Sequence, residues 1–361
     1  MRRLLLVTVA LSLIIVAALP SVVSAQPCNP YNQGLWETRA PIPGPIVRAW
    51  GQFFPGNGNF YALGGRASDT AGSDYLNPRE YVPGNPGTWT VKASAFPDNQ
   101  VNNMVGGILN IGGSNVIVLV GGSAAGATTA TAAVRTYDPM TDTITPLPSD
   151  NWPGNVSGTN LPGGAAVVGN VLYVFGGFNI NVGMLTQIWA FDGSAPAGSR
   201  WTQKAASLPN PRGYIPTAEV GGMIYMIGGS LWDGTTLQDT AETVRYDPVA
   251  DTVTTLASTP RATAETRAFR HPFDNTVWVI GGGRTPPNPS AQVDVYNPAT
   301  NTFTTADPML TARRNFPAGF NVALEEMWAV GGYDAATGLP IQANEYFHCQ
   351  VPVDLMSFDV T

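Results

Sequence analysis

The segment NVLYVFGGFN, residues 170–179, joins a short apolar run to a pair of glycines, and this combination recurs along the chain. Six apolar runs end in Gly-Gly, with the first glycine at positions 64, 121, 176, 228, 281 and 331. The spacing between successive pairs is therefore 57, 55, 52, 53 and 50 residues. In five of the six copies the residue three before the first glycine is Tyr or Trp. A period of this length indicates a repeat architecture.

Each repeat carries further short apolar-polar runs besides the one that ends in Gly-Gly. A variable loop follows the glycines, and then a run such as VRTYDP at 134–139 ends in an aromatic residue and Asp-Pro or Asn-Pro. A third kind of run, such as RWTQKAASLP at 200–209, comes soon afterwards. Alternation with β-branched and aromatic residues favours strands over helices. Four strands per repeat are typical of a propeller blade, so the sequence predicts an all-β, six-bladed propeller of four-stranded antiparallel blades.

These motifs resemble the Kelch repeat, in which hydrophobic residues and Gly-Gly precede Tyr-Asp-Pro and then a Trp position. The resemblance covers residues 34–349, although Ile144, Val253 and Phe303 stand at the Trp position in three copies. It implies that aromatic side chains fill the space between blades. The glycines are expected where the chain turns between crowded backbones and a Cβ would cause strain. Such a resemblance says little about function, because one fold hosts many activities.

The N-terminal part of the sequence predicts export. Arg2 and Arg3 precede an apolar stretch, and residues 23–25 give the small-x-small pattern of a signal-peptide cleavage site. The alternative is an uncleaved anchor, but the apolar part is short for a span of about 20 residues. We therefore expect a signal peptide over 1–25, a propeller over 26–349, and a secreted, periplasmic or cell-surface location. Residues 350–361 do not fit the repeat and are either a packing strand or the start of another domain.

The charge balance of the chain disfavours two classes of partner. The formal net charge is −7 at pH 7, and loss of the two arginines with the signal peptide would make it −9. Proteins that bind nucleic acid or anionic lipid usually present basic surfaces. We therefore expect neither nucleic acid nor a membrane as a partner.

The first copy of the Trp-containing run is out of order. GLWETRAPIP at 34–43 resembles the fourth strand of a blade but precedes the first three, whereas no fourth strand follows Tyr346 in the last repeat. The N-terminal strand is therefore predicted to complete the last blade and close the ring. Cys28 and Cys349 are the two cysteines of the chain, and they flank these two antiparallel neighbours. In an exported protein we expect them to form a disulfide.

Motifs that would indicate catalysis or metal binding are missing from the sequence. It contains no G-x-S-x-G, HExxH, CxxC or P-loop. Its two histidines, His271 and His348, belong to different repeats, which disfavours a metal site built from protein ligands. We expect His271 in a solvated turn and His348 in a structural role. No cofactor and no metal are expected.

Arginines are concentrated in one part of the repeat. Seven fall between a fourth strand and the next Gly-Gly strand: Arg48, Arg212, Arg261, Arg267, Arg270, Arg313 and Arg314. The Kelch resemblance places this stretch at the innermost strand, at the mouth of the central channel. Arginine there either ties loops to backbone carbonyls or binds a carboxylate bidentately. The residues predicted to bind a ligand are Arg48, Arg212, Tyr214, Trp232, Arg267 and Arg314.

Two functions fit these observations. The first is a secreted binding module for an extracellular glycan, peptide or small carboxylate, and the lack of a catalytic constellation favours it. The second is a sugar epimerase or mutarotase, because an exported six-bladed Kelch protein is similar in outline to N-acetylneuraminate epimerases. That resemblance implies that arginines hold the sugar carboxylate while Glu265 or Glu219 moves protons.

Overall fold

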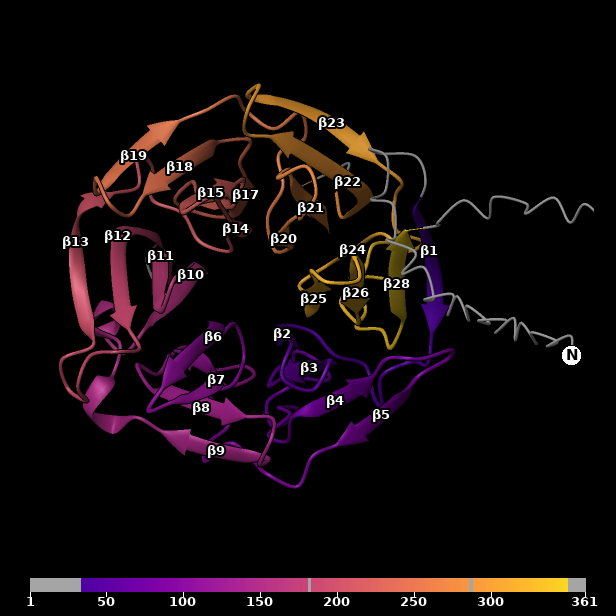
Figure 1. Ribbon diagram of the computed structural model, residues 1–361, viewed down its shortest axis with the longest axis horizontal. Helices are drawn as coiled ribbons and strands as arrows, with labels where there is room; N and C mark the ends of the chain where they lie inside the picture. Colours follow the sequence, from indigo (N-terminus) through magenta and orange to yellow (C-terminus); the bar gives the residue numbers. More distant parts are fainter. Residues whose placement is uncertain (1–33, 181–182, 286–287, 350–361) are drawn as a thin grey trace, which may run out of the picture.

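The computed structural model describes residues 34–180, 183–285 and 288–349. Six four-stranded antiparallel sheets formed by these residues stand around a common axis, as predicted (Figure 1). The helices among them are two short 3-10 turns, η1 (Pro148–Asp150) and η2 (Pro153–Asn155). Within these described ranges there is no helix with the length and apolar character needed to cross a membrane.

Five blades follow the order of the chain, with the first strand innermost (Figure 1). Blade 1 consists of β2 (Trp50–Phe54), β3 (Asn59–Leu63), β4 (Arg79–Val82) and β5 (Thr88–Val91). Blade 2 consists of β6 (Val105–Ile111), β7 (Ser114–Val120), β8 (Val134–Asp138) and β9 (Thr143–Pro146). Blade 3 consists of β10 (Asn160–Val168), β11 (Val171–Asn179), β12 (Gly183–Asp192) and β13 (Trp201–Ser207).

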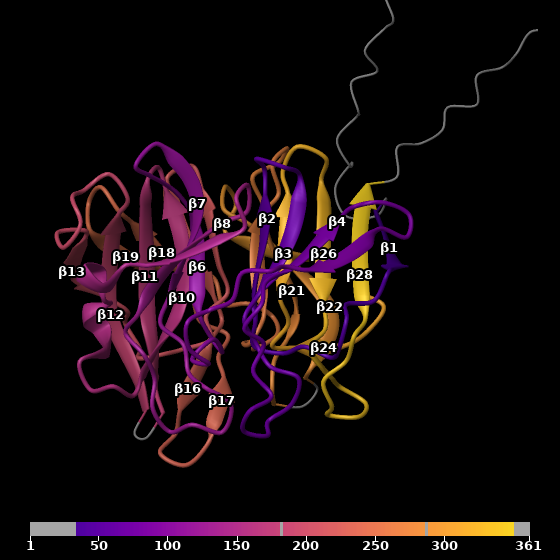
Figure 2. The same ribbon diagram turned by 90° about the horizontal axis from the view of Figure 1, so that it is seen from below.

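Blades 4 and 5 have the same order of strands. Blade 4 consists of β14 (Thr217–Val220), β15 (Met223–Ile227), β18 (Thr243–Asp247) and β19 (Thr252–Thr255). Blade 5 consists of β20 (Arg267–Arg270), β21 (Val277–Gly282), β22 (Ser290–Asn297) and β23 (Thr302–Ala306). Two short pairs lie outside the blades: β16 (Ser230–Trp232) with β17 (Leu237–Asp239), and β24 (Arg313–Arg314) with β27 (Tyr333–Asp334). We call the face that carries β16, β17 and β24 the mouth face (Figure 2).

The last blade joins the two ends of the described chain. It consists of β25 (Ala318–Asn321), β26 (Glu326–Val330), β28 (Asn344–Cys349) and β1 (Gly34–Arg39). Strand β1 pairs antiparallel with β28, and Gly34 stands opposite Cys349. The N-terminal strand is therefore the outermost strand of blade 6, as the order of motifs predicts. Cys28 lies outside the described residues, so the disulfide stays a prediction.

Aromatic side chains of the Gly-Gly strands fill the gaps between blades. In five blades such a residue packs on an aromatic ring of the next blade, with ring centroids 5.3–6.1 Å apart. The pairs are Tyr61–Tyr137, Tyr173–Tyr246, Tyr225–Tyr296, Trp278–Phe347 and Trp328–Phe60. The glycines mark the crowded turn beyond, since Gly228 has a φ of +78° and a Cβ there would lie 2.2 Å from the Thr263 carbonyl oxygen.

Tryptophans of the outermost strands tie neighbouring blades together in blades 1, 3 and 6. Each indole N–H donates to a backbone carbonyl just after the outermost strand of the preceding blade. The bonds run from Trp89 to Ala40 at 2.8 Å, from Trp201 to Asp150 at 2.7 Å and from Trp36 to Asp307 at 3.0 Å.

A different contact replaces the tryptophan in blades 2, 4 and 5, where Ile144, Val253 and Phe303 stand at its position. The turn before the outermost strand then presents Asp142, Asp251 or Asn301. Their side-chain oxygens accept backbone N–H bonds from Ala93 at 3.0 Å, Ala205 at 2.8 Å and Ala257 at 2.9 Å, all in or just after the preceding outermost strand. The imperfect Trp signal therefore reflects two ways of making one inter-blade contact.

Candidate functional site

The loops that enter the innermost strands share an unusual backbone conformation. Five residues, each two or three positions before such a strand, have φ between 50° and 60°: Arg48, Asn103, Tyr214, Glu265 and Asn315. This left-handed region is costly for residues other than glycine, and such outliers are concentrated at functional sites. We call these five residues the inner ring.

Backbone hydrogen bonds join the inner ring from blade to blade. The amide of Asn103 donates to the carbonyl of Arg48, Arg48 to Asn315, Asn315 to Glu265, and Glu265 to Tyr214, at 2.6–3.2 Å. Blade 3 has Pro162-Gly163-Gly164 at this level, and Ile215 donates to the Gly163 carbonyl at 2.7 Å. Each bond contributes about 1 kcal/mol, which offsets part of the strain.

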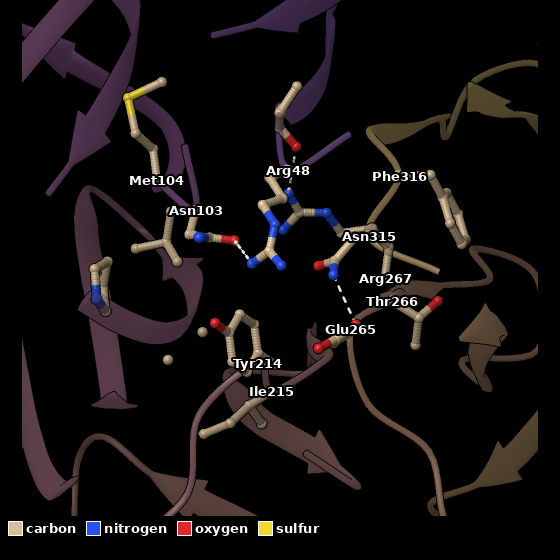
Figure 3. Close-up of a pocket in the computed structure, with 15 residues that line it drawn as sticks. Arg48, Asn103, Met104, Tyr214, Ile215, Glu265, Thr266, Arg267, Asn315 and Phe316 are labelled. Carbon is tan, nitrogen blue, oxygen red and sulfur yellow. Dashed lines mark hydrogen bonds between the residues drawn. The ribbon is translucent and has the colours of Figure 1, made fainter. Parts of the chain in front are cut away.

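The inner-ring side chains converge on a cavity of about 60 Å³ at the axis (Figure 3). Arg48, Tyr214 and Glu265 point toward one another there, and the Arg48 Nη1 lies 3.5 Å from the Asn103 Oδ1. Arg267, the first residue of β20, also lines this cavity. We call it the axial pocket.

Glu265 is the centre of an ion-pair network on one side of the axial pocket. Its fully buried carboxylate accepts hydrogen bonds from Arg284 at 2.7 and 3.1 Å, from the Asn315 side chain at 2.6 Å, and from Arg314. Burial alone would raise the pKa of Glu265, but Arg314, Arg284 and Arg48 outweigh it and lower the pKa below the usual value. The group is therefore ionised at neutral pH, which suits it to holding cations rather than donating a proton.

Arg48 and Arg267 line the axial pocket, and no carboxylate oxygen of the described residues lies within 4.0 Å of either guanidinium. Burial opposes the charge on Arg48, but Tyr214, Glu265 and Tyr333 outweigh it and raise its pKa. Arg267 lies 3.9 Å above the Trp50 ring, and burial lowers its pKa to about 9, which leaves it charged at neutral pH. With Arg284 and Arg314, four arginines lie in or beside the axial pocket, and among the carboxylates of the described residues only Glu265 lines it. The centre of this acidic protein is therefore rich in positive charge.

Three of the six predicted ligand-binding residues, Arg48, Tyr214 and Arg267, meet in the axial pocket. Arg314 lies beside it, paired with Glu265 and placed 4.6 Å above the Tyr333 ring. Trp232 does not line the axial pocket. It lies on β16 nearer the mouth face, and the centroid of its ring is 6.5 Å from that of Phe178.

Arg212 has the other role considered for arginine at this level of the repeat. Its side chain is fully buried, and its Nη1 donates to the carbonyls of Gly228 and Glu242 at 2.8 and 3.0 Å. Arg261 and Arg313 likewise donate to the carbonyls of the Gly281 and Gly331 turns. These three arginines fix the Gly-Gly turns and do not line the axial pocket.

The sequence analysis missed Asn103, Asn315 and Arg284. One partial signal was available, because Arg48, Glu265 and Asn315 each stand 16 residues before the first glycine of a pair. The same spacing also selects Arg212, which does not line the pocket. No sequence signal places Arg284, which reaches Glu265 from the loop after the glycines of blade 5. Glu219 lies on β14, and its Oε1 accepts a bond from the Gly222 amide at 2.7 Å in its own hairpin.

Comparison with known proteins supports the fold and leaves the function open. No family model matches the chain, and no curated protein matches it. Among solved structures 657 chains match, and the structure of YjhT does so with a TM-score of 0.64. The alignment covers 85% of this chain and 96% of that one at 15% identity, so the likeness concerns the propeller fold alone. Because one fold serves many activities, any functional argument has to rest on the axial pocket.

Proposed function

We propose that this protein binds a small ligand through a carboxylate held in the axial pocket. The observation that carries the proposal is the pair of pocket-lining cations, Arg48 and Arg267, which have no carboxylate partner within 4.0 Å among the described residues. Both arginines are half-buried, and charges withdrawn from water are normally paired. A guanidinium matches a carboxylate with two parallel hydrogen bonds, so a ligand carboxylate would complete the site.

The rest of the axial pocket supports a small anionic group rather than a chain. Its volume of about 60 Å³ accommodates a carboxylate or a few waters. Glu265 holds Arg314 and Arg284 to one side, and Asn103 and Tyr214 present neutral polar groups toward the centre. Among the ligand classes considered from the sequence, a carboxylated small molecule therefore fits better than a glycan or peptide bound across the surface.

Calorimetric titration with N-acetylneuraminate and butyrate, each compared with its methyl ester, tests the proposal. We expect at least one acid to bind, and its ester to bind at least about tenfold more weakly, because charge-assisted hydrogen bonds are lost. Arg48→Met and Arg267→Met should each raise the Kd by about tenfold or more. Lys204→Met makes the same change of charge on outer strand β13 and should leave the Kd unchanged. Equal affinity for acid and ester would contradict the proposal.

A sugar mutarotase or epimerase is the alternative function. The observation in its favour is a carboxylate, Glu265, beside Tyr214 and Arg48 in one pocket. The lowered pKa of Glu265 and its arginine partners favour a binding role instead. Polarimetry of N-acetylneuraminate with the protein separates the two: we expect no acceleration of mutarotation. Acceleration that disappears in Glu265→Gln would establish the enzyme.

We also propose that the chain is exported and that a Cys28–Cys349 disulfide fastens the ring. Cys349 stands opposite Gly34, and Cys28 precedes Gly34 by six residues in the sequence. The bridge would close a loop of about 320 residues, and the chain-entropy model gives at most roughly 5 kcal/mol for it. Peptide mapping of the non-reduced, secreted protein should recover the two cysteine peptides as one linked species. Two free thiols would contradict this.

A further inference from the structure

A larger cavity continues from the axial pocket along the propeller axis. It has a volume of about 370 Å³, and its walls are the innermost strands of all six blades (Figure 1). Arg267 and Ile215 line both this cavity and the axial pocket, so the two spaces meet at these residues. We call the larger cavity the channel. A ligand whose carboxylate occupies the axial pocket has room for its remaining atoms in the channel.

Small and apolar side chains form most of the channel wall. Nine of its 22 lining residues are Gly or Ala, and seven others are Ile, Val, Pro or Phe. Small residues are needed where inner strands approach, since a Cβ at Gly51 would lie 2.2 Å from the backbone of Ala318. Arg267 begins β20 and Arg270 ends it, about 10 Å further along. An apolar stretch therefore separates the charged groups at the two ends.

Arg267 and the Trp50 ring lie together where the channel meets the axial pocket. Trp50 lines the channel and is only 7% exposed. The Arg267 guanidinium lies over this ring, and among the described residues it donates one hydrogen bond, to the Ala49 carbonyl at 3.3 Å. A guanidinium carries five N–H donors, so most of its donors have no protein acceptor among the described residues. A carboxylate placed here would accept hydrogen bonds from Arg267.

We infer that the ligand is a carboxylate with an unbranched apolar tail, such as a medium-chain fatty acid. Its head is held at Arg267, and its tail lies between the small side chains of the channel. This inference rests on the proposed function, and it adds the chemical class of the ligand. Three features carry it: a pocket with room for little more than the head, a sixfold larger and mostly apolar space beyond, and an arginine at the junction whose guanidinium makes one protein hydrogen bond among the described residues.

The affinity of straight-chain acids for the wild-type protein tests the inference. Butyrate, hexanoate, octanoate and decanoate are titrated calorimetrically, with octanol as the uncharged control. Burial of each CH₂ should lower the Kd about fourfold until the channel is filled, and octanol should bind much more weakly than octanoate. A Kd that does not change along the series would overturn the inference. Binding of octanol as tight as that of octanoate would do the same.

Separate variants test where the apolar tail and where the carboxylate of the ligand bind. Ala268→Leu and Ala218→Leu narrow the channel, so they should weaken octanoate binding by tenfold or more while butyrate binding is retained. Arg267→Met should reduce octanoate binding to the level of octanol, whereas Lys204→Met should not change it. Thermal midpoints identify any variant that fails to fold, and the wild-type series then decides alone. If butyrate binds but the Kd does not fall with chain length, only this inference fails. If no acid binds, the proposed function fails too.

Discussion

Trp36→Ala is expected to destabilise the protein by about 3–5 kcal/mol, the range for removing a buried tryptophan. Trp36 is 6% exposed, its ring lies 5.5 Å from that of Phe347, and its indole N–H donates to the Asp307 carbonyl. It is thus a main attachment of β1 to blades 5 and 6. Because β1 is the outermost strand of blade 6, the variant weakens the closure of the ring itself. The thermal midpoint, followed by circular dichroism, measures the effect.

Trp201→Ala is the matched control for this prediction. Trp201 occupies the equivalent position in blade 3 and makes the same kind of bond, to the Asp150 carbonyl. Its blade, however, is continuous in the chain, and the residue is only half-buried. We expect Trp201→Ala to lose less stability than Trp36→Ala. Limited proteolysis should cut Trp36→Ala near residue 40 earlier than wild type, whereas Trp201→Ala should be cut there no earlier than wild type. If both variants lose the same stability and neither exposes the N-terminal strand to protease, closure through β1 is not the weak point.

The fold could be predicted because its signals are local and repeated. Gly-Gly marks a backbone turn that no other residue adopts easily, so six copies fix the number of blades. The order of motifs also places β1, because a fourth strand without its first three has one possible partner. His271 shows the limit of local reasoning: it was expected in a solvated turn, but it is 4% exposed and stacks on Trp278. Its burial depends on blade packing, which the sequence around it does not reveal.

The site was predicted only in part because neighbouring arginines face different ways. Arg48 is itself the left-handed residue of its loop, so its side chain reaches the axis. Arg212 stands two residues before the equivalent Tyr214, and its side chain turns back to the Gly-Gly turn. A shift of two positions thus separates a pocket residue from a structural one. Neither composition nor alignment of the repeats on their glycines resolves that difference, because Arg212 stands 16 residues before Gly228, the same spacing as Arg48 before Gly64.

Glu265→Gln is expected to cost about 3 kcal/mol at neutral pH. Removing one member of a buried ion pair typically costs 3–5 kcal/mol, because the partner charge stays behind. Here Arg284 and Arg314 keep some access to solvent, which places the value at the lower end. A loss of this size corresponds to a decrease of several degrees in the thermal midpoint. Glu219→Gln is the control, since the Glu219 carboxylate has no ion pair among the described residues and accepts a bond from its own hairpin.

The pH dependence of the gap in thermal midpoint between wild type and Glu265→Gln identifies the cause of that gap. The pKa of Glu265 is lower in the folded protein than its ordinary value of 4.5, because the nearby arginines outweigh its burial. The carboxylate therefore stabilises the fold fully above that ordinary value, and the contribution is lost as the pH falls through the lower, folded pKa. The gap in thermal midpoint between wild type and Glu265→Gln should stay constant from pH 7 to pH 6 and then shrink below about pH 4.5. A gap that is unchanged at pH 3 would show that the glutamine disturbs packing, and that Glu265 does not act by holding the pocket arginines through its charge.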